Sequence, residues 1–143
     1  MAAPKLTVKE LERLLSAEFP QMLNAKGGYA IEEVWHGGGR VRKVFHRHSL
    51  RPGGTIAGTT MMALADFTPY VAILATIGWV PLAATTSLSI NFLRKPPQRD
   101  LLAHARLIKL GKRLAVSLID IGSDGEDDPV AHATSTYSIP PER

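Results

Sequence analysis

Asp66 is the residue of this sequence that is best placed to do chemistry. It is the only charged side chain in residues 58–78, which read GTTMMALADFTPYVAILATIG. An ionised carboxylate that is buried without a partner costs several kcal/mol. Hydrogen bonds, a raised pKa or partial exposure to a pocket must therefore offset that cost, and each of these suits a general base or a nucleophile. The alternative is a structural aspartate held by backbone groups or by an arginine.

Residues 58–78 are expected to form one long helix with apolar side chains on every face. Such a helix is either buried inside a protein or crosses a membrane, and a spanning helix needs about 20 apolar residues with almost no charge. Asp66 and Pro69 argue against a membrane span, so we expect a buried helix. Because Pro69 has no N–H, the carbonyl of Ala65 should lose its helical partner, and a kink is expected beside Asp66.

The composition is that of one globular domain covering residues 1–143, with 45% hydrophobic and 21% charged residues. The absence of cysteine excludes disulfides, thiol nucleophiles and cysteine-ligated metals, and it fits a cytoplasmic protein. The N-terminus does not read as a signal peptide. A net charge of +4 permits an anionic ligand. Nucleic acid is not expected, because the basic residues are dispersed and are not interleaved with aromatics.

The remaining elements must position Asp66. Thr7 and Glu10 form a capping-box pattern that starts a helix over about residues 7–24. Alternating or apolar runs bounded by glycine and proline predict strands over residues 29–35, 40–47, 83–93, 101–109, 113–121 and 130–139. Short links between the later strands imply an antiparallel sheet. A single apolar helix must be covered, so the expected fold is α+β of the hotdog type, with five to six curved antiparallel strands around the helix.

Two further patterns are weaker candidates for function. Gly37-Gly38-Gly39 lies between two strands and lacks the Lys-Ser/Thr of a phosphate-binding loop, so it predicts a hairpin. His46 and His48 are two apart on a predicted strand and would share one face. No third ligand is close in sequence, so neither a metal nor another cofactor is expected.

Three runs of this sequence resemble the phenylacetate-pathway (PaaI-like) hotdog thioesterases, small acyl-coenzyme A hydrolases. The first run covers residues 51–66 and includes Leu64-Ala65-Asp66. The second is the strand ATTSLSINFLR at residues 84–94, and the third pairs Asp100-Leu-Leu-Ala-His-Ala with Gly111-Lys-Arg. The resemblance covers about residues 28–139.

The resemblance implies roles for several residues. Asp66 falls on the catalytic carboxylate, which acts as general base or nucleophile, and Gly58 falls on the glycine whose backbone N–H polarises the thioester carbonyl. The Thr59 N–H lies next to it. Pro52, Gly54 and Thr85 also match the family pattern.

Four positions depart from that pattern: Arg51 replaces Asn, Ala57 replaces His, Thr59 replaces Gly, and Ser87 replaces a frequent acidic residue. Because Ala57 removes a side chain that usually lies beside the scissile carbonyl, we hypothesise that Arg51 compensates. Arg51 would either supply a donor near the carbonyl or pair with Asp66, and pairing would lower the pKa of that carboxylate.

The implied activity is hydrolysis of an acyl-CoA thioester. In such enzymes the site forms between two subunits, which implies a homodimer, or a homotetramer built as a dimer of dimers, with shared active sites. Residues that could contact the CoA phosphates lie at strand ends and turns, namely Arg94, Lys95, Arg99, Lys112 and Arg113. The acyl chain would lie along helix residues such as Met61, Met62 and Tyr70.

Two other functions stay open at this point. One is an acyl-CoA-binding protein without turnover, which the loss of the histidine at Ala57 makes a serious alternative. The other is a hotdog enoyl-CoA hydratase or dehydratase, in which His48 would have to pair with Asp66.

Overall fold

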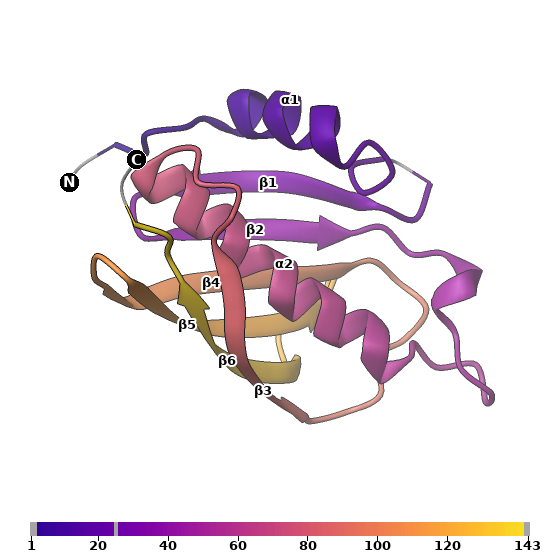
Figure 1. Cartoon of the computed structure of the whole chain (residues 1–143). Helices are drawn as coiled ribbons and strands as arrows, with labels where there is room; N and C mark the ends of the chain where they lie inside the picture. The colour runs from indigo at the N-terminus through magenta and orange to yellow at the C-terminus, as the bar shows by residue number, and fades with distance from the viewer. Residues whose placement is uncertain (1–2, 25, 142–143) are drawn as a thin grey trace.

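The apolar segment forms the central helix α2 (Gly58–Ile77) of the computed structural model, which describes residues 3–24 and 26–141 (Figure 1). Ala57 precedes the helix in extended backbone, and Gly78 ends it with φ of 104°, a value that favours glycine. Twelve of its twenty residues are buried. By length and composition alone α2 would qualify as a membrane span, but 67% of its most apolar window is buried inside the protein.

A six-stranded antiparallel sheet packs against α2 and completes an α+β hotdog fold. Its strands are β1 (Tyr29–Trp35), β2 (Gly38–Lys43), β3 (Ala84–Phe92), β4 (Leu101–Leu110), β5 (Leu114–Ser123) and β6 (Pro129–Ser138). Their spatial order is β1-β2-β4-β5-β6-β3. Alternate residues of the central strands face the helix and are buried, as in Ala115, Ser117, Ile119 and Ile121 of β5.

The helix α1 (Val8–Glu18) begins at the predicted capping box, in which Thr7 and Glu10 bond each other's backbone N–H. It lies over β1 at the edge of the sheet (Figure 1) and buries Leu11 and Leu15. The predicted helix over residues 7–24 is too long. Phe19 leaves the helical region because the residue before a proline disfavours helical backbone, and Pro20 follows it.

The prediction that His46 and His48 share a strand is wrong. β2 ends at Lys43, and residues Arg47–Ser49 form a short 3-10 turn. Asp100, immediately before β4, accepts a hydrogen bond from the Phe45 N–H at 2.7 Å and another from Arg42 at 3.0 Å. Because the Asp100 carboxylate accepts the Phe45 N–H, this N–H is not available to a neighbouring strand, and the chain turns away after β2.

The strand β3 lies beside α2 and runs antiparallel to it. Near its start, Thr85 hydrogen-bonds Asp66 in the middle of the helix. At its end, the Phe92 ring covers the first residue of the helix, since a β-carbon on Gly58 would lie 3.3 Å from Phe92 Cζ. β3 pairs with β6 on one side only. Among the described residues, the other edge of β3 is free of strand partners.

Candidate active site

Asp66 is half-buried, and one of its two carboxylate oxygens is held by neighbouring hydroxyl groups. Thr85 Oγ1 donates to Oδ1 at 2.5 Å. The Tyr137 hydroxyl donates to the backbone carbonyl of Asp66 and lies 3.4 Å from Oδ1. Within the described chain, Oδ2 has no hydrogen-bond partner, and neither a backbone N–H nor an arginine contacts the carboxylate. The side chain is thus oriented by one oxygen while the other can accept a proton or attack a substrate.

Asp66 opens into a cavity of about 380 Å³ with mainly apolar and aromatic walls. The walls combine α2, the segment that follows α1, the start of β1, the loop before β3, the start of β3, and β6. They comprise Phe19, Met22, Tyr29, Ala63, Phe67, Tyr70, Pro81, Ala83, Ala84, Thr85 and Tyr137. Two ring stacks order these walls: Tyr29 on Phe67, with centroids 4.8 Å apart, and Tyr70 on Tyr137, at 6.2 Å.

The tyrosines around Asp66 stay protonated well above neutral pH. Burial, and secondarily the negative charge of Asp66, raises the pKa of Tyr29 to about 12. Burial also raises the pKa of Tyr137, and the Asp66 charge adds to that increase. Both phenols therefore stay neutral near pH 7 and keep their hydroxyl protons.

The start of α2 forms a second cavity, of about 330 Å³, that contains Gly58. The backbone N–H groups of Gly58 and Thr59 find no acceptor among the described residues, as expected for the first turn of a helix. Arg51, Arg94 and Lys95 line the same cavity. This arrangement of free N–H groups, a helix N-terminus and cations favours a negatively charged or oxyanionic ligand.

The other predicted contacts are distributed around these two cavities. Gly54 lies beside Arg51 in the loop before α2, where its carbonyl accepts a hydrogen bond from Gln98 at 2.9 Å. Met62, on α2, is 41% exposed, and Ser87, on β3, is also exposed. Arg51 makes no ion pair with Asp66 inside the described chain, so the pairing version of the Arg51 hypothesis has no support within one subunit.

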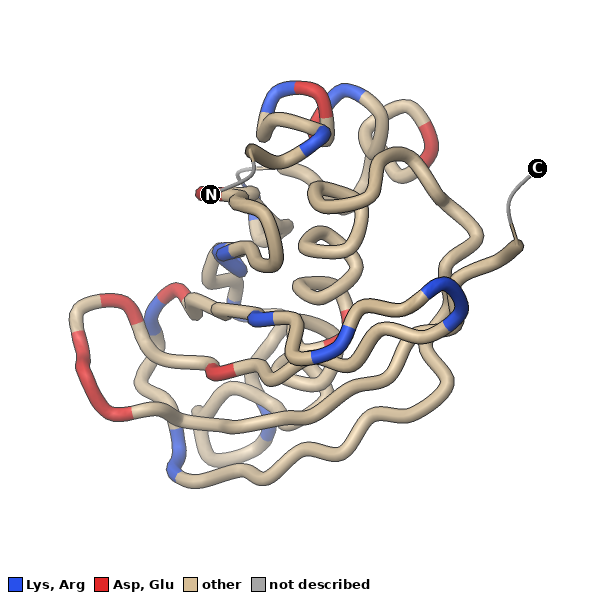
Figure 2. The backbone as a smooth tube through the Cα atoms, turned by 90° about the vertical axis from the view of Figure 1, so that its left-hand side faces the viewer, with Lys and Arg blue, Asp and Glu red and all other residues tan. Residues whose placement is uncertain are grey.

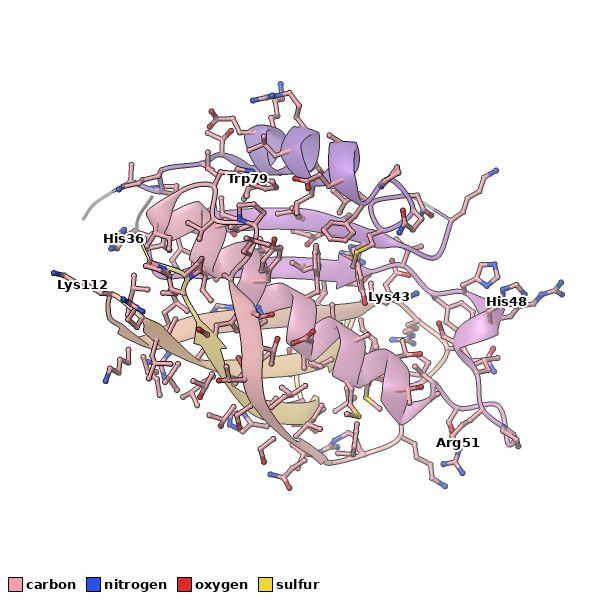
Figure 3. All side chains as sticks on the ribbon, in the orientation of Figure 1. His36, Lys43, His48, Arg51, Trp79 and Lys112 are labelled. Atoms are coloured by element: carbon pink, nitrogen blue, oxygen red, sulfur yellow. The ribbon has the colours of Figure 1, made fainter. Side chains whose placement is uncertain are left out.

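Lys112 and Arg113 are separated from the Gly58 cavity. With Lys5 they line a third cavity, of about 520 Å³, beside the C-terminal end of α2. Figure 3 shows Lys112 and Arg51 at opposite ends of the molecule. Figure 2, in which the backbone is coloured by residue type, shows several acidic residues together on one exposed turn and the basic residues distributed over other parts of the chain. Arg94 and Lys95 thus lie apart from Lys112 and Arg113, and Arg99 lines neither cavity but lies 3.9 Å from Glu126.

Gly58 and Asp66 are also separated, because they occupy the same rigid helix. Eight residues at 1.5 Å of rise per residue place them about 12 Å apart along the axis. A hydrogen bond spans about 3 Å. One substrate carbonyl therefore cannot contact the Gly58 N–H and the Asp66 carboxylate of the same chain.

Tyr29 and Tyr137 are not among the site residues predicted from the sequence. Tyr137 is 71 positions from Asp66, and their hydrogen bond exists only in the folded chain. A sequence signal did exist for Tyr137, because it lies between the polar residues Thr136 and Ser138 on a predicted strand and shares a strand face with Ile139. A buried tyrosine hydroxyl usually needs a partner, and Asp66 is the carboxylate of the helix that it faces.

The sequence matches the family model of the thioesterase superfamily over residues 53–129, a stretch that contains Gly58, Asp66 and Thr85. This protein belongs to the thioesterase superfamily. The search of curated proteins found no match.

Solved structures agree with that assignment. A candidate thioesterase from Silicibacter sp. TM1040 is 43% identical, with 96% of this chain and 94% of that chain covered and a TM-score of 0.86. A hypothetical thioesterase from Streptococcus pneumoniae, solved with coenzyme A, is 25% identical (83% and 91% covered, TM-score 0.69). PaaI from E. coli is 22% identical (80% and 80% covered, TM-score 0.72) and shows a shared fold.

The effect of the Asp66 charge on the pKa of Tyr29 can be tested by removing that charge. In the Asp66→Asn variant the pKa of Tyr29 should fall below about 12, because one of its two causes is removed, but it should stay above the ordinary value of 10.0, because burial remains. The protein contains three tyrosines. NMR of protein labelled with ¹³C-tyrosine would therefore resolve each titration. The Asp120→Asn variant is the control, since that exposed carboxylate lies on the other face of the sheet against His132. An unchanged Tyr29 titration in Asp66→Asn would contradict the described geometry.

Proposed function

We propose that this thioesterase-superfamily protein hydrolyses acyl-coenzyme A thioesters with Asp66 as its catalytic carboxylate. The observation that carries the proposal is the state of Asp66: Oδ1 is held by Thr85, and Oδ2 is unpaired within the described chain and opens on an apolar cavity. An oriented carboxylate with one free oxygen is what a general base or a nucleophile requires. The coenzyme A in the Streptococcus pneumoniae relative supports CoA as the carrier. The runs at residues 51–66 and 84–94 support a place near the PaaI-like group.

The reaction needs an attacking group and an oxyanion donor. As general base, Asp66 Oδ2 takes a proton from a water molecule while the water oxygen adds to the thioester carbonyl carbon. The carbonyl oxygen becomes an oxyanion, which the N–H groups of Gly58 and Thr59 stabilise at the positive end of the helix dipole. Collapse of this intermediate breaks the C–S bond, and the CoA thiolate takes up the proton. As nucleophile, Asp66 would instead add to the thioester carbonyl carbon and expel the CoA thiolate, which leaves an anhydride on Asp66 that water then hydrolyses.

The Gly58 N–H and the Asp66 carboxylate of one chain lie about 12 Å apart. We therefore propose that two chains form each site. β3 offers the means, since it is an exposed edge strand whose start touches Asp66 and whose end covers Gly58. If two β3 strands pair antiparallel about a point between Leu88 and Ser89, Thr85 of one chain lies opposite Phe92 of the other. The Gly58 N–H of one subunit then approaches Asp66 of its partner. A two-fold dimer of this kind contains two identical sites.

The cations of the Gly58 cavity are suited to the CoA phosphates. Arg94 is oriented by the Pro129 carbonyl at 3.0 Å and by Asp128 at 3.5 Å, and half of its side chain is exposed. Arg51 has no acidic partner among the described residues and lines the same cavity. Exposed guanidinium groups of this kind bind phosphate with directed hydrogen bonds.

A second candidate function is acyl-CoA binding without turnover. It is favoured by Ala57, which caps α2 without any side-chain hydrogen bond and supplies no group beside a scissile carbonyl. The hydratase alternative has less support, since no histidine lines the Asp66 cavity among the described residues. His48 lies in the turn Arg47–Ser49, away from this cavity (Figure 3).

Removal of the Asp66 charge separates hydrolysis from simple binding. In a thiol-release assay with short, long and aromatic acyl-CoAs, Asp66→Asn should lower kcat by about 10²- to 10⁴-fold, the usual contribution of a general base. The Asp120→Asn variant should retain wild-type activity. Turnover that is unaffected in Asp66→Asn would refute the assigned role. Binding of acyl-CoA by the wild-type protein without any thiol release would support the second candidate.

Gly58 allows its N–H to be removed with little change of the backbone. Proline is tolerated at the first position of a helix, and Ala57 already has φ −66° and ψ 145°, a conformation that a following proline accepts. Gly58→Pro should lower kcat by about 10²- to 10³-fold, the cost of losing one oxyanion donor. Gly58→Ala is the matched control, because it adds the same β-carbon near Phe92 and keeps the N–H. Equal activity losses in both variants would show that the N–H is not the oxyanion donor.

A further inference from the structure

A cluster of lysine and histidine side chains lies where the chain leaves β2, apart from the cavities of Gly58 and Asp66. It surrounds a cavity of about 200 Å³ that is lined by Lys26, Gly27, Lys43, His46, His48 and Ser49. None of these residues lines the Gly58 cavity or the Asp66 cavity. Figure 3 shows His48 on the side of the molecule opposite Lys112. The proposed hydrolysis therefore leaves this cluster without a role.

Two of these side chains are held in defined positions. Lys43 Nζ donates to the carbonyls of Gly27 and Val44, which leaves one of its three N–H groups free within the described chain. His46 Nδ1 accepts the His48 N–H at 3.0 Å, so the neutral ring carries its proton on Nε2. Gly27 lets the His46 side chain pack closely, since a β-carbon on Gly27 would lie 2.7 Å from His46 Cβ. These donors are thus oriented by the protein itself.

The turn that carries the two histidines is also fixed by backbone hydrogen bonds. The Ser49 N–H donates to the His46 carbonyl at 2.9 Å, and the Ser49 carbonyl accepts the Ala57 N–H at 2.7 Å. The rings of His46 and His48 are in contact, with centroids 4.2 Å apart. Because the groups around the cavity are already ordered, a ligand would bind with little further loss of conformational freedom.

The positive charge of this cavity has no acidic complement. Lys26 and Lys43 line it, and no carboxylate does so among the described residues. Asp100 is an acidic residue whose charge acts on Lys43, but its oxygens already accept from the Phe45 N–H and from Arg42. Burial lowers the pKa of Lys43, because removal of the ammonium group from water disfavours its charge. An anion beside Lys43 would offset that cost.

The donors and the volume indicate the class of ligand. A metal ion fits poorly, because lysines repel cations and the described residues include no group of three histidine, cysteine or carboxylate side chains that could hold one. Ammonium, imidazole N–H and hydroxyl groups are all donors to the oxygens of an anion. A volume of about 200 Å³ is below that of pockets for drug-sized ligands, but it accommodates a tetrahedral oxyanion.

We propose that the cavity between Lys43 and His48 binds a phosphate-type dianion, which is either the free ion or the phosphate group of a larger molecule. Lys26 and Lys43 supply the positive charge, and the histidine rings and the Ser49 hydroxyl supply further donors. This inference goes beyond the proposed hydrolysis and does not depend on it, since none of these residues lines the cavity of Asp66 or of Gly58.

Sulfate is the first probe, because it is a tetrahedral dianion that binds no proton near neutral pH. The protein contains five histidines, which NMR of histidine-labelled protein follows separately. At constant ionic strength, sulfate should shift the ring signals of His46 and His48 to saturation, while those of His104 and His132 stay in place. An equal response to chloride would overturn the proposal, because screening would then account for the shifts.

His48→Gln and Lys26→Met each alter one exposed side chain of the cavity, so neither should prevent folding. Each should raise the dissociation constant of sulfate, followed at His46, by about threefold to tenfold, the range expected for one net hydrogen bond. Lys112→Met is the matched control, because it removes an exposed lysine from the cavity of about 520 Å³, and it should leave the constant unchanged. Sulfate binding that neither His48→Gln nor Lys26→Met weakens would reject the proposal.

Two further probes identify the source of the phosphate group. Inorganic phosphate and glycerol 3-phosphate are titrated into the same labelled protein. Tighter binding of the ester, with the same dependence on His48 and Lys26, assigns the site to a phosphorylated molecule, and equal or weaker binding assigns it to the free ion. Both results support the site. If none of the three anions shifts the His46 and His48 signals, the inference fails, whether or not the thiol-release assay supports hydrolysis.

Discussion

The eight helical residues between Gly58 and Asp66 constrain everything that this site can do. Both groups belong to α2, which is uninterrupted from Gly58 to Ile77 and buried over most of its length, so neither can move toward the other without disrupting the core. The oxyanion donor and the carboxylate therefore stay about 12 Å apart in each chain. A reaction that needs the Gly58 N–H and the Asp66 carboxylate at the same carbonyl group must therefore take these two groups from two different chains.

The strand β3 links these two halves of the site. It touches Asp66 through Thr85, covers Gly58 with Phe92, and leaves its outer edge unpaired within the described chain. An unpaired strand edge is normally protected or used for association. The hydrogen bonds from Thr85 and Tyr137 serve the same arrangement, because they orient Asp66 from within its own subunit and leave the other face of the carboxylate toward the cavity.

Much of the fold could be predicted from the sequence, because local patterns determine it. The apolar run on all sides of α2 and the strand alternation are properties of neighbouring residues, and the Thr7 capping box specifies where α1 begins. The exceptions depend on distant partners: Asp100 binds the Phe45 N–H across 55 positions and ends the strand that was expected to include His46. The site residues show the same difference between local patterns and distant contacts. Asp66 was visible as a lone charge in an apolar segment, whereas Tyr29 and Tyr137 join it only through tertiary packing.

The most direct test of this account mixes two inactive variants, Asp66→Asn and Gly58→Pro, by co-expression or by joint refolding. If each site combines Asp66 of one chain with Gly58 of the other, every mixed dimer contains one intact site and one doubly altered site. Random pairing should then restore about a quarter of the wild-type thiol-release activity. Activity of the mixture that does not exceed that of either variant alone, although mixed dimers are shown to form, would contradict a shared site.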